Sequence, residues 1–335
     1  MKILFLTHLK DDAQAVNDII NDSLLHGLRE NHGVDVIDYP GAWYMYKDEI
    51  SKRSFDISKL WGSGFTYYDN LTNYNSIDRT DIKQKIENNF FDYIIYGSFT
   101  RSNIFFEQSL KSKSKIILID GEDNTNLHFN KNEKIIFFKR ELIDTKPNVF
   151  PINVTIPKRK ITNEINLNPK NILAPLIPHR YKTYIYKKEN DYYNMWKDSL
   201  FGVTYVHGGW WEAVRYYEML MNGCIPLILD LKECPDRTLT KLPKEKLVKI
   251  FEDFSWILSQ ENPFRIYKKK FLNFKRISSS LYHLFKKKYD SKKLLEEFPE
   301  VNDYRKDLLE HTKKYLTTEH IAEYVIKTSE KFYSR

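Results

Sequence analysis

Residues 201–231, FGVTYVHGGWWEAVRYYEMLMNGCIPLILDL, place two apolar runs of strand length on either side of a segment with helical periodicity. The runs are 201–206 and 225–231, and each is short enough for a single strand. Between them, 211–221 contains helix formers, and the Asn-Gly pair that follows is a C-terminal cap signal. The pattern predicts a strand, a glycine loop, a helix and a buried strand in succession.

Two glycines, Gly208 and Gly209, come just before the expected helix. Without Cβ atoms they let a ligand approach free N–H groups and the positive end of the helix dipole. Arg215 and Glu218 are three residues apart and share one helix face. A guanidinium can hold diphosphate oxygens, and a carboxylate can accept hydrogen bonds from sugar hydroxyls. The pattern fits a nucleotide diphosphate, although a solvated Arg–Glu pair after a tight turn has the same spacing.

The order Gly-Gly-Trp, Arg, two aromatics, Glu and Asn-Gly-Cys-Ile-Pro resembles the nucleotide-sugar-binding half of GT-B glycosyltransferases. The similarity is to the exostosin-like and related bacterial and viral members. The resemblance implies that Glu218 holds the ribose hydroxyls of the donor and that Arg215 holds its diphosphate. It places Gly208, Gly209 and Trp210 in the loop around the donor.

Flanking segments extend this resemblance over most of residues 180–330. They are TYIYKKENDYYNMWKDSLFG, CPDRTLTKLPKE and HTKKYLTTEHIAEYVIK, whereas the N-terminal half is similar only through IDGEDN and FFKREL. Many retaining GT-B enzymes carry a second glutamate eight residues ahead of the ribose-binding one, and Trp210 occupies that position here. Glu212 is only six residues ahead, so retention and inversion of the anomeric centre both stay open.

The whole chain is long enough for two domains, because its 335 residues are 41% hydrophobic and 15% aromatic. The N-terminal half alternates strand-like and helix-like segments, beginning with a strand at 2–7, a helix over 13–31 and a strand at 34–39. A proline-containing run around 147–157 is interpreted as a connection. We therefore expect an α/β protein with two Rossmann-like domains, GT-B-like, and an interdomain cleft.

The expected domains are 1–160, on the acceptor side, and 161–335, which binds the nucleotide sugar. The second ends in a helical segment whose last helix is expected to pack back on the first. No apolar run approaches the ~20 residues that span a bilayer. The apolar run in the opening MKILFLTHLKDD is too short for the core of a signal peptide. With two cysteines only, Cys224 and Cys234, we expect a cytoplasmic protein, and peripheral membrane association stays open.

Ligands of open α/β sheets bind beyond the carboxyl ends of the strands. The loop after the first strand would present His8, Asp11 and Asp12 there. An inverting transferase needs a general base for the acceptor hydroxyl, and Asp11 or Asp12 is the first candidate. Asp120, which ends a strand, is another. Asp12 as a helix cap and Asp120 as a turn residue are the structural alternatives.

His179 and Arg180 follow the first strand of the second half, where a cation could steady the diphosphate leaving group. The nine histidines are scattered and no Asp-x-Asp occurs, so we expect no metal and no cofactor. The donor would be a substrate such as a UDP- or GDP-sugar.

Residues 264–289 mix Lys and Arg with aromatics and contain no acidic residue, and the net charge is +8. A solvated helix face, a contact with an anionic membrane or glycan surface, and a DNA or RNA contact all fit this segment. The predicted function is sugar transfer from a nucleotide diphosphate donor to a hydroxyl, expected on a glycan. A phage- or virus-type transferase that modifies DNA bases is one alternative, and a non-enzymatic nucleic-acid-binding protein is another.

Overall fold

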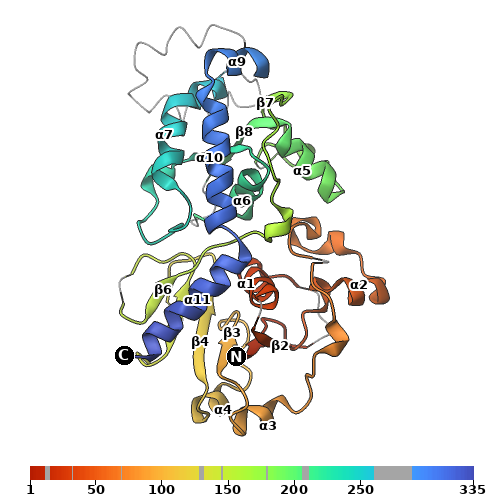
Figure 1. Ribbon diagram of the computed structural model, residues 1–335, viewed down its shortest axis with the longest axis vertical. Helices are drawn as coiled ribbons and strands as arrows, with labels where there is room; N and C mark the ends of the chain where they lie inside the picture. The colour runs from red at the N-terminus through yellow and green to blue at the C-terminus, as the bar shows by residue number, and fades with distance from the viewer. Residues whose placement is uncertain are drawn as a thin grey trace.

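The computed structural model shows two parallel β-sheets with helices around them (Figure 1). The residues that it describes are 1–11, 16–31, 33–68, 70–127, 132–144, 146–178, 180–205, 211–259 and 289–335. The first sheet lies in the lower part of Figure 1 and the second in the upper part.

The first sheet has six strands in the order β2-β1-β3-β4-β5-β6, and all neighbours are parallel. The strands are β1 Lys2–Leu6, β2 Asp35–Tyr39, β3 Tyr93–Tyr96, β4 Lys115–Asp120, β5 Ile136–Lys139 and β6 Val149–Pro151. The chain goes from β1 to β2 on one side and then to β3 on the other. This reversal is the topological switch point, where open α/β sheets bind ligands.

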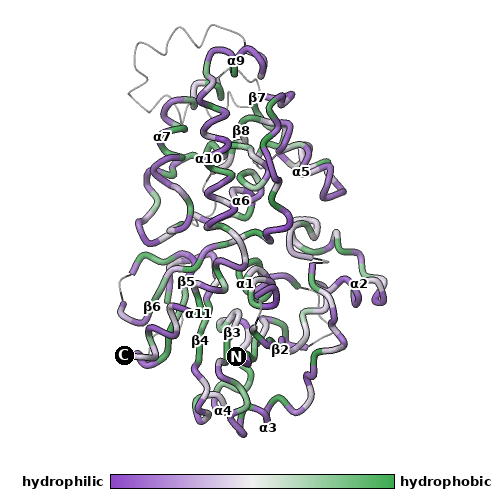
Figure 2. Tube along the Cα trace, viewed as in Figure 1, coloured by the Kyte–Doolittle hydropathy of each residue, from purple (hydrophilic) through white to green (hydrophobic). Residues whose placement is uncertain are grey.

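Alternate side chains of β1 enter two separate cores. Ile3 and Phe5 belong to one buried cluster, and Leu4 and Leu6 belong to the other. Strands buried on both faces need apolar residues at every position, which explains the short continuous apolar runs of the sequence. Figure 2 shows the same contrast between apolar strands such as β4 and the more polar outer segments.

The helix predicted over 13–31 begins later, because α1 spans Ile19–Glu30. Asp18 is its N-cap, and its carboxylate accepts a hydrogen bond from the Asn21 N–H at 3.1 Å. Between β2 and α3 runs a long segment that contains α2. The remaining helices of this part are α2 Lys47–Arg53, α3 Ile82–Glu87 and α4 Phe106–Lys111.

The proline-containing run was predicted as a connection, and this is wrong in part because it supplies β6. This strand is at the edge of the sheet, where Pro151 can be accommodated without the loss of a central ladder bond. Proline is compatible with an edge strand as well as with a break in regular structure, so its presence alone does not exclude a strand.

The second sheet has the order β7-β8-β9 and is parallel. Its strands are β7 Asn171–Leu173, β8 Ser199–Tyr205 and β9 Ile225–Leu229. Its helices are α5 Glu189–Lys197, α6 Val214–Met221, α7 Lys244–Phe254, α9 Ser291–Glu297 and α10 Glu300–Tyr315. The predicted strand, helix and strand of residues 201–231 are therefore confirmed as β8, α6 and β9, although α6 begins three residues later than expected.

The end of α6 follows the predicted cap. Gly223 has φ 70°, its N–H donates to the Leu220 carbonyl at 3.1 Å, and the Cys224 N–H donates to the Met219 carbonyl at 3.0 Å. These two bonds form a Schellman motif. Arg305 of α10 donates to the Gly223 carbonyl at 2.7 Å, so a cation completes this helix terminus.

The last helix, α11 Thr318–Tyr333, crosses back and packs against α1 of the first sheet (Figure 1). The two helices approach so closely at Gly27 that a Cβ there would lie 1.8 Å from the Thr318 carbonyl oxygen. His26 adds a hydrogen bond to the Thr318 hydroxyl at 2.8 Å. The C-terminal segment is thus fixed to the opening part of the chain.

The predicted α/β class with parallel sheets is confirmed. The GT-B-like interpretation, the interdomain cleft and the boundary at residue 160 stay predictions. Within the described ranges, no helix is both long and apolar enough to cross a membrane.

Candidate functional site

Glu218 lies on the buried side of α6, the helix that follows β8 in the chain. Only 5% of this residue is exposed. One carboxylate oxygen accepts a hydrogen bond from the Thr66 hydroxyl and the other from the Tyr192 hydroxyl, each at 2.7 Å. Burial raises the pKa of the Glu218 carboxyl, although the bonds from Tyr192 and Thr66 oppose this shift. The carboxylate therefore binds two hydroxyl groups, both of them from the protein.

Thr66 reaches Glu218 from the long segment between β2 and α3, which belongs to the first sheet. Its φ of 81° is rare for a β-branched residue and marks a strained backbone. Its N–H donates to Glu189 at 2.7 Å, and its hydroxyl lies 2.8 Å from that of Tyr193. Lys160 pairs with the same Glu189 carboxylate. The two halves of the chain meet at this cluster.

Arg215 is in the first turn of α6, as predicted. Its guanidinium lies 5.4 Å from the centroid of the Tyr184 ring. Its Nε is buried and has no hydrogen-bond partner among the described residues. Residues 206–210 lie outside those residues, and so do the predicted donor contacts Gly208, Gly209 and Trp210.

A carboxylate from the first sheet binds the backbone just ahead of α6. Glu141, which follows β5 and is fully buried, accepts the N–H groups of Trp211 and Glu212, each at 3.0 Å. Arg140 lies 3.7 Å from the same carboxylate. The backbone N–H groups just ahead of α6 therefore bind a carboxylate of the protein itself. Free N–H groups near the start of a helix favour such an anion.

Glu212 also joins the two halves. One of its oxygens accepts the Val154 N–H at 3.0 Å, the Asn153 amide at 3.3 Å and the Tyr217 hydroxyl. The other oxygen is buried and has no partner among the residues described. Burial raises the pKa of Glu212 to about 7, against the opposing effect of Arg140. This carboxyl group can change its protonation near neutral pH.

A second carboxyl group of this kind is near the switch point of the first sheet. Asp22 of α1 is fully buried and accepts hydrogen bonds from the Tyr44 hydroxyl at 2.9 Å and the Asn21 amide at 3.0 Å. Burial raises the pKa of Asp22 to about 7, and the nearby His8 partly opposes the shift. Perturbed groups of this kind are enriched at functional sites, although ion-pair networks also produce them.

Tyr67 lies in the electrostatic field of these carboxyl groups. Its hydroxyl donates to the Thr155 carbonyl at 2.7 Å. Burial raises the pKa of Tyr67 well above its usual value, and the charges of Glu218, Glu212 and Asp22 add to the shift. The charges of Asp22, on α1, and of Glu212 and Glu218, ahead of and on α6, thus all act on one tyrosine.

The three predicted catalytic aspartates have different positions. Asp11 is exposed in the loop after β1, and Asp12 lies outside the described residues. Asp120 is fully buried at the end of β4, where it accepts a hydrogen bond from Lys139 at 2.9 Å and from the Glu122 N–H at 3.0 Å. This is the environment of a structural ion pair, and a catalytic role for any of the three stays a prediction.

The remaining predicted contacts are only partly visible. Arg180 lies in a turn between β7 and α5, where its N–H donates to the Ile177 carbonyl at 3.1 Å. His179 and residues 264–288 of the basic segment lie outside the described part of the chain. Among the residues described, no group of three His, Cys, Asp or Glu side chains could hold a metal ion.

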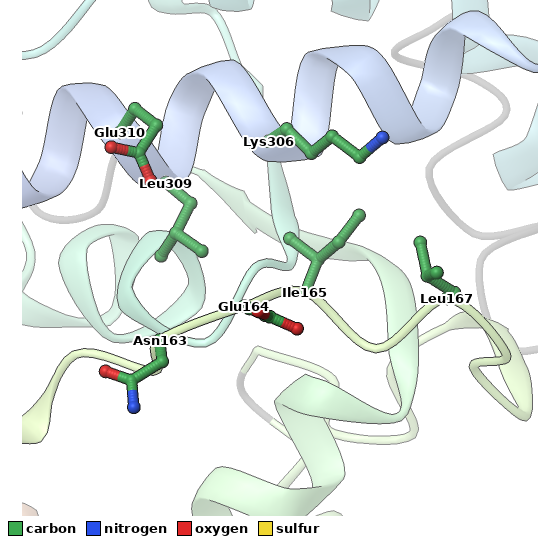
Figure 3. Close-up of a pocket in the computed structure, with 7 residues that line it drawn as sticks. All are labelled: Asn163, Glu164, Ile165, Leu167, Lys306, Leu309 and Glu310. Atoms are coloured by element: carbon green, nitrogen blue, oxygen red, sulfur yellow. The ribbon is translucent and has the colours of Figure 1, made fainter.

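A groove of about 240 Å³ lies between residues 163–167 and α10 (Figure 3). Leu309 and Ile165 point toward one another across it, and Lys306 and Glu310 lie along the helix. None of the predicted site residues lines this groove, so we do not assign the donor to it.

The sequence reasoning missed Thr66, Glu141, Asp22 and Tyr67. Their contacts reach residues far away in the chain, and only Glu141 lies in a segment that the sequence singled out, FFKREL. Only Thr66 has an unusual local conformation, its positive φ, and a sequence does not reveal backbone angles.

Comparison with known proteins finds solved structures similar to this chain, among them a glucosyltransferase. No family model matches the chain, and no curated protein matches it. The solved structure is an "alpha-glucosyltransferase in complex with UDP and a 13-mer DNA containing a central A:G mismatch", with 10% sequence identity and a TM-score of 0.43 over 100% of both chains. A likeness at this identity and TM-score does not establish a shared fold or activity.

Proposed function

We propose that this protein transfers a sugar from a nucleotide diphosphate donor to an acceptor hydroxyl. The observation that carries the proposal is the pair of hydroxyl groups bound by the Glu218 carboxylate at 2.7 Å on α6. A carboxylate that already accepts from two hydroxyls has the chemistry needed to bind the two hydroxyls of a ribose. Arg215, one turn earlier, offers a cation for the diphosphate.

The donor would lie at the approach to α6, with Gly208, Gly209 and Trp210 around it and with His179 and Arg180 on the side of β7. A UDP- or GDP-sugar fits these groups. Protein cations and N–H groups would stabilise the leaving diphosphate, so we propose a reaction without a bound metal.

The general base belongs on the acceptor side. To the candidates from the sequence, Asp11, Asp12 and Asp120, we add Asp22. Its pKa of about 7 suits proton transfer at neutral pH, and it lies beside the switch point of the first sheet. We place Asp22 first because Asp120 is held by Lys139.

The acceptor is proposed to be a hydroxyl on a glycan. Transfer to a nucleic acid is the second candidate, and a row of cations along α11, described below, favours it.

Thermal denaturation with nucleotides tests the proposal. UDP or GDP at a hundred times its Kd should stabilise the wild type by about 2.7 kcal/mol. Glu218→Ala and Glu218→Gln should lose most of this effect, and the Gln variant keeps the shape of the side chain. Glu296→Ala, at an exposed position of α9, is the matched control and should respond like the wild type. If no nucleoside diphosphate or nucleotide sugar stabilises the wild type, the proposal is wrong.

A further inference from the structure

The outer face of α11 carries a groove with an unusual lining. The groove has a volume of about 370 Å³ and lies where α11 passes β6. Three cations and three aromatic rings line it, together with the hydroxyl of Thr328. The cations are Lys327, Lys331 and Arg335, and the rings are Phe150, Tyr324 and Phe332. No carboxylate is among these lining residues.

The three cations form a regular row. They are four residues apart in the sequence. Lys327 and Lys331 lie on α11, where their side chains begin roughly 6 Å apart along the axis, and Arg335 follows just beyond the end of the helix. Glu323 pairs with Lys327 at 2.5 Å, whereas Lys331 and Arg335 form no ion pair with a described residue. A row of positive charges fits a partner whose negative charges are also in a row.

A loop of the second sheet extends the row beyond Lys327. Lys241 places its ammonium group 4.6 Å from the centroid of the Tyr324 ring. Arg237 is anchored beside it by a hydrogen bond of 2.9 Å to the Val149 carbonyl. Both cations make the electrostatic potential at the Tyr324 end of the groove more positive, which favours an anion there.

We propose that this row, Lys241, Lys327, Lys331 and Arg335, binds the phosphate backbone of a nucleic acid strand. Half-buried rings beside the row offer apolar edges and faces for unpaired bases. An acidic peptide would make no use of the aromatic rings. A nucleic acid strand offers unpaired bases for the rings and a repeating series of phosphates for the row of cations.

The inner end of the row is close to the proposed site. Thr240, next to Lys241, donates to the Asn153 side chain at 2.9 Å, and Asn153 donates to Glu212 at 3.3 Å. A strand on this row would therefore extend toward the carboxyl groups around Tyr67. In this respect the inference rests on the proposed sugar transfer, with its second candidate, a nucleic acid, as the acceptor in place of a glycan.

Fluorescence anisotropy with a labelled single-stranded DNA oligonucleotide tests the surface. We expect the double variant Lys331→Ala/Arg335→Ala to bind at least tenfold more weakly than the wild type at low salt. The slope of log K against log salt should become shallower by about 1.4, from 0.7 for each lost phosphate contact. The control Lys292→Ala/Lys293→Ala removes the same charge from the exposed face of α9.

Equal weakening in both double variants would show diffuse attraction and overturn the proposal, and so would the absence of oligonucleotide binding by the wild type. Preferential binding of the row to phosphatidylserine vesicles would also overturn it, in favour of a membrane surface. Stabilisation by UDP or GDP should persist in both double variants. If oligonucleotide binding depends on the row but no nucleotide stabilises the protein, the proposed transferase fails while the surface stands.

Discussion

Glu212 and Glu218 are six residues apart, yet their carboxyl groups bind different parts of the first half of the chain. Glu218 binds Thr66, and Glu212 binds the backbone of Val154. Both are buried, and each would lose its partner from the first half if the halves separated. Buried carboxyl groups with such long-range partners respond to pH, because burial disfavours their charged form.

The pH dependence of stability tests the environment of Glu212. Its pKa is about 7 in the folded protein, against 4.5 without the fold. The folded state therefore holds a proton that the unfolded state has lost, and stability falls as pH rises from about 4.5 to 7. The contribution is up to about 1.4 kcal/mol for each pH unit in this window.

In urea unfolding from pH 4.5 to 8, Glu212→Gln should show a weaker fall in stability than the wild type. Asp22, whose pKa is also raised to about 7, should sustain part of the fall in both proteins. Glu245→Gln, at an exposed position of α7, is the control and should follow the wild type. Parallel curves for Glu212→Gln and the wild type would contradict the raised pKa.

Asp22→Asn separates catalysis from donor binding. If Asp22 is the general base, the amide should reduce transfer at least a hundredfold, a typical effect for such a group. Stabilisation by UDP should not change, because Asp22 lies on α1 and not on α6. Transfer rates and thermal shifts should be compared with those of Asp11→Asn, which removes the exposed candidate. A larger loss in Asp11→Asn would assign the base to the loop after β1.

At the scale of elements, the segment around Thr66 inserts between the two halves. Its ring Phe65 packs against Tyr192 with 5.4 Å between centroids, and Thr66 and Tyr192 both bind Glu218. A ribose that bound Glu218 would meet these two hydroxyls first. The strained φ of Thr66 shows that its contacts outweigh a conformational cost of about 1–3 kcal/mol.

Removal of the Thr66 hydroxyl should therefore strengthen nucleotide binding, because one competitor for the Glu218 carboxylate is lost. We expect Thr66→Ala to bind UDP or GDP about fivefold more tightly, the equivalent of one net hydrogen bond of about 1 kcal/mol. Thr66→Ser keeps the hydroxyl and should bind like the wild type. Isothermal titration gives the Kd of each variant. Weaker binding by Thr66→Ala would mean that Thr66 orients Glu218 for the donor and does not compete with it.

At the scale of the whole molecule, the sequence predicted what depends on neighbouring residues. The apolar runs of β1 and β9 and the Asn-Gly end of α6 are local signals, and all three are found. Glu218 was predicted as a site residue, but its grouping with Glu212 and Asp22 near Tyr67 was not, because these carboxyl groups come from α1, from α6 and from the segment ahead of α6. Periodicity indicates which face of an element is buried, but it does not show which residue of another element lies opposite.

The contact between α1 and α11 ties the ends of the chain together, and Gly27 makes it possible. A methyl group at Gly27 would meet the Thr318 carbonyl at 1.8 Å, so the helices would have to move apart. We expect Gly27→Ala to lower the free energy of unfolding by about 3 kcal/mol, the upper range for overpacking.

Gly33→Ala is the control, since its Cβ would meet open space and only its φ of 88° is unfavourable. That change should cost about 1 kcal/mol. Urea unfolding measures both, and equal losses would mean that α11 can shift on α1 without penalty. Because α11 also carries Lys327 and Lys331 of the row, Gly27→Ala should displace these cations and weaken oligonucleotide binding more than Gly33→Ala does.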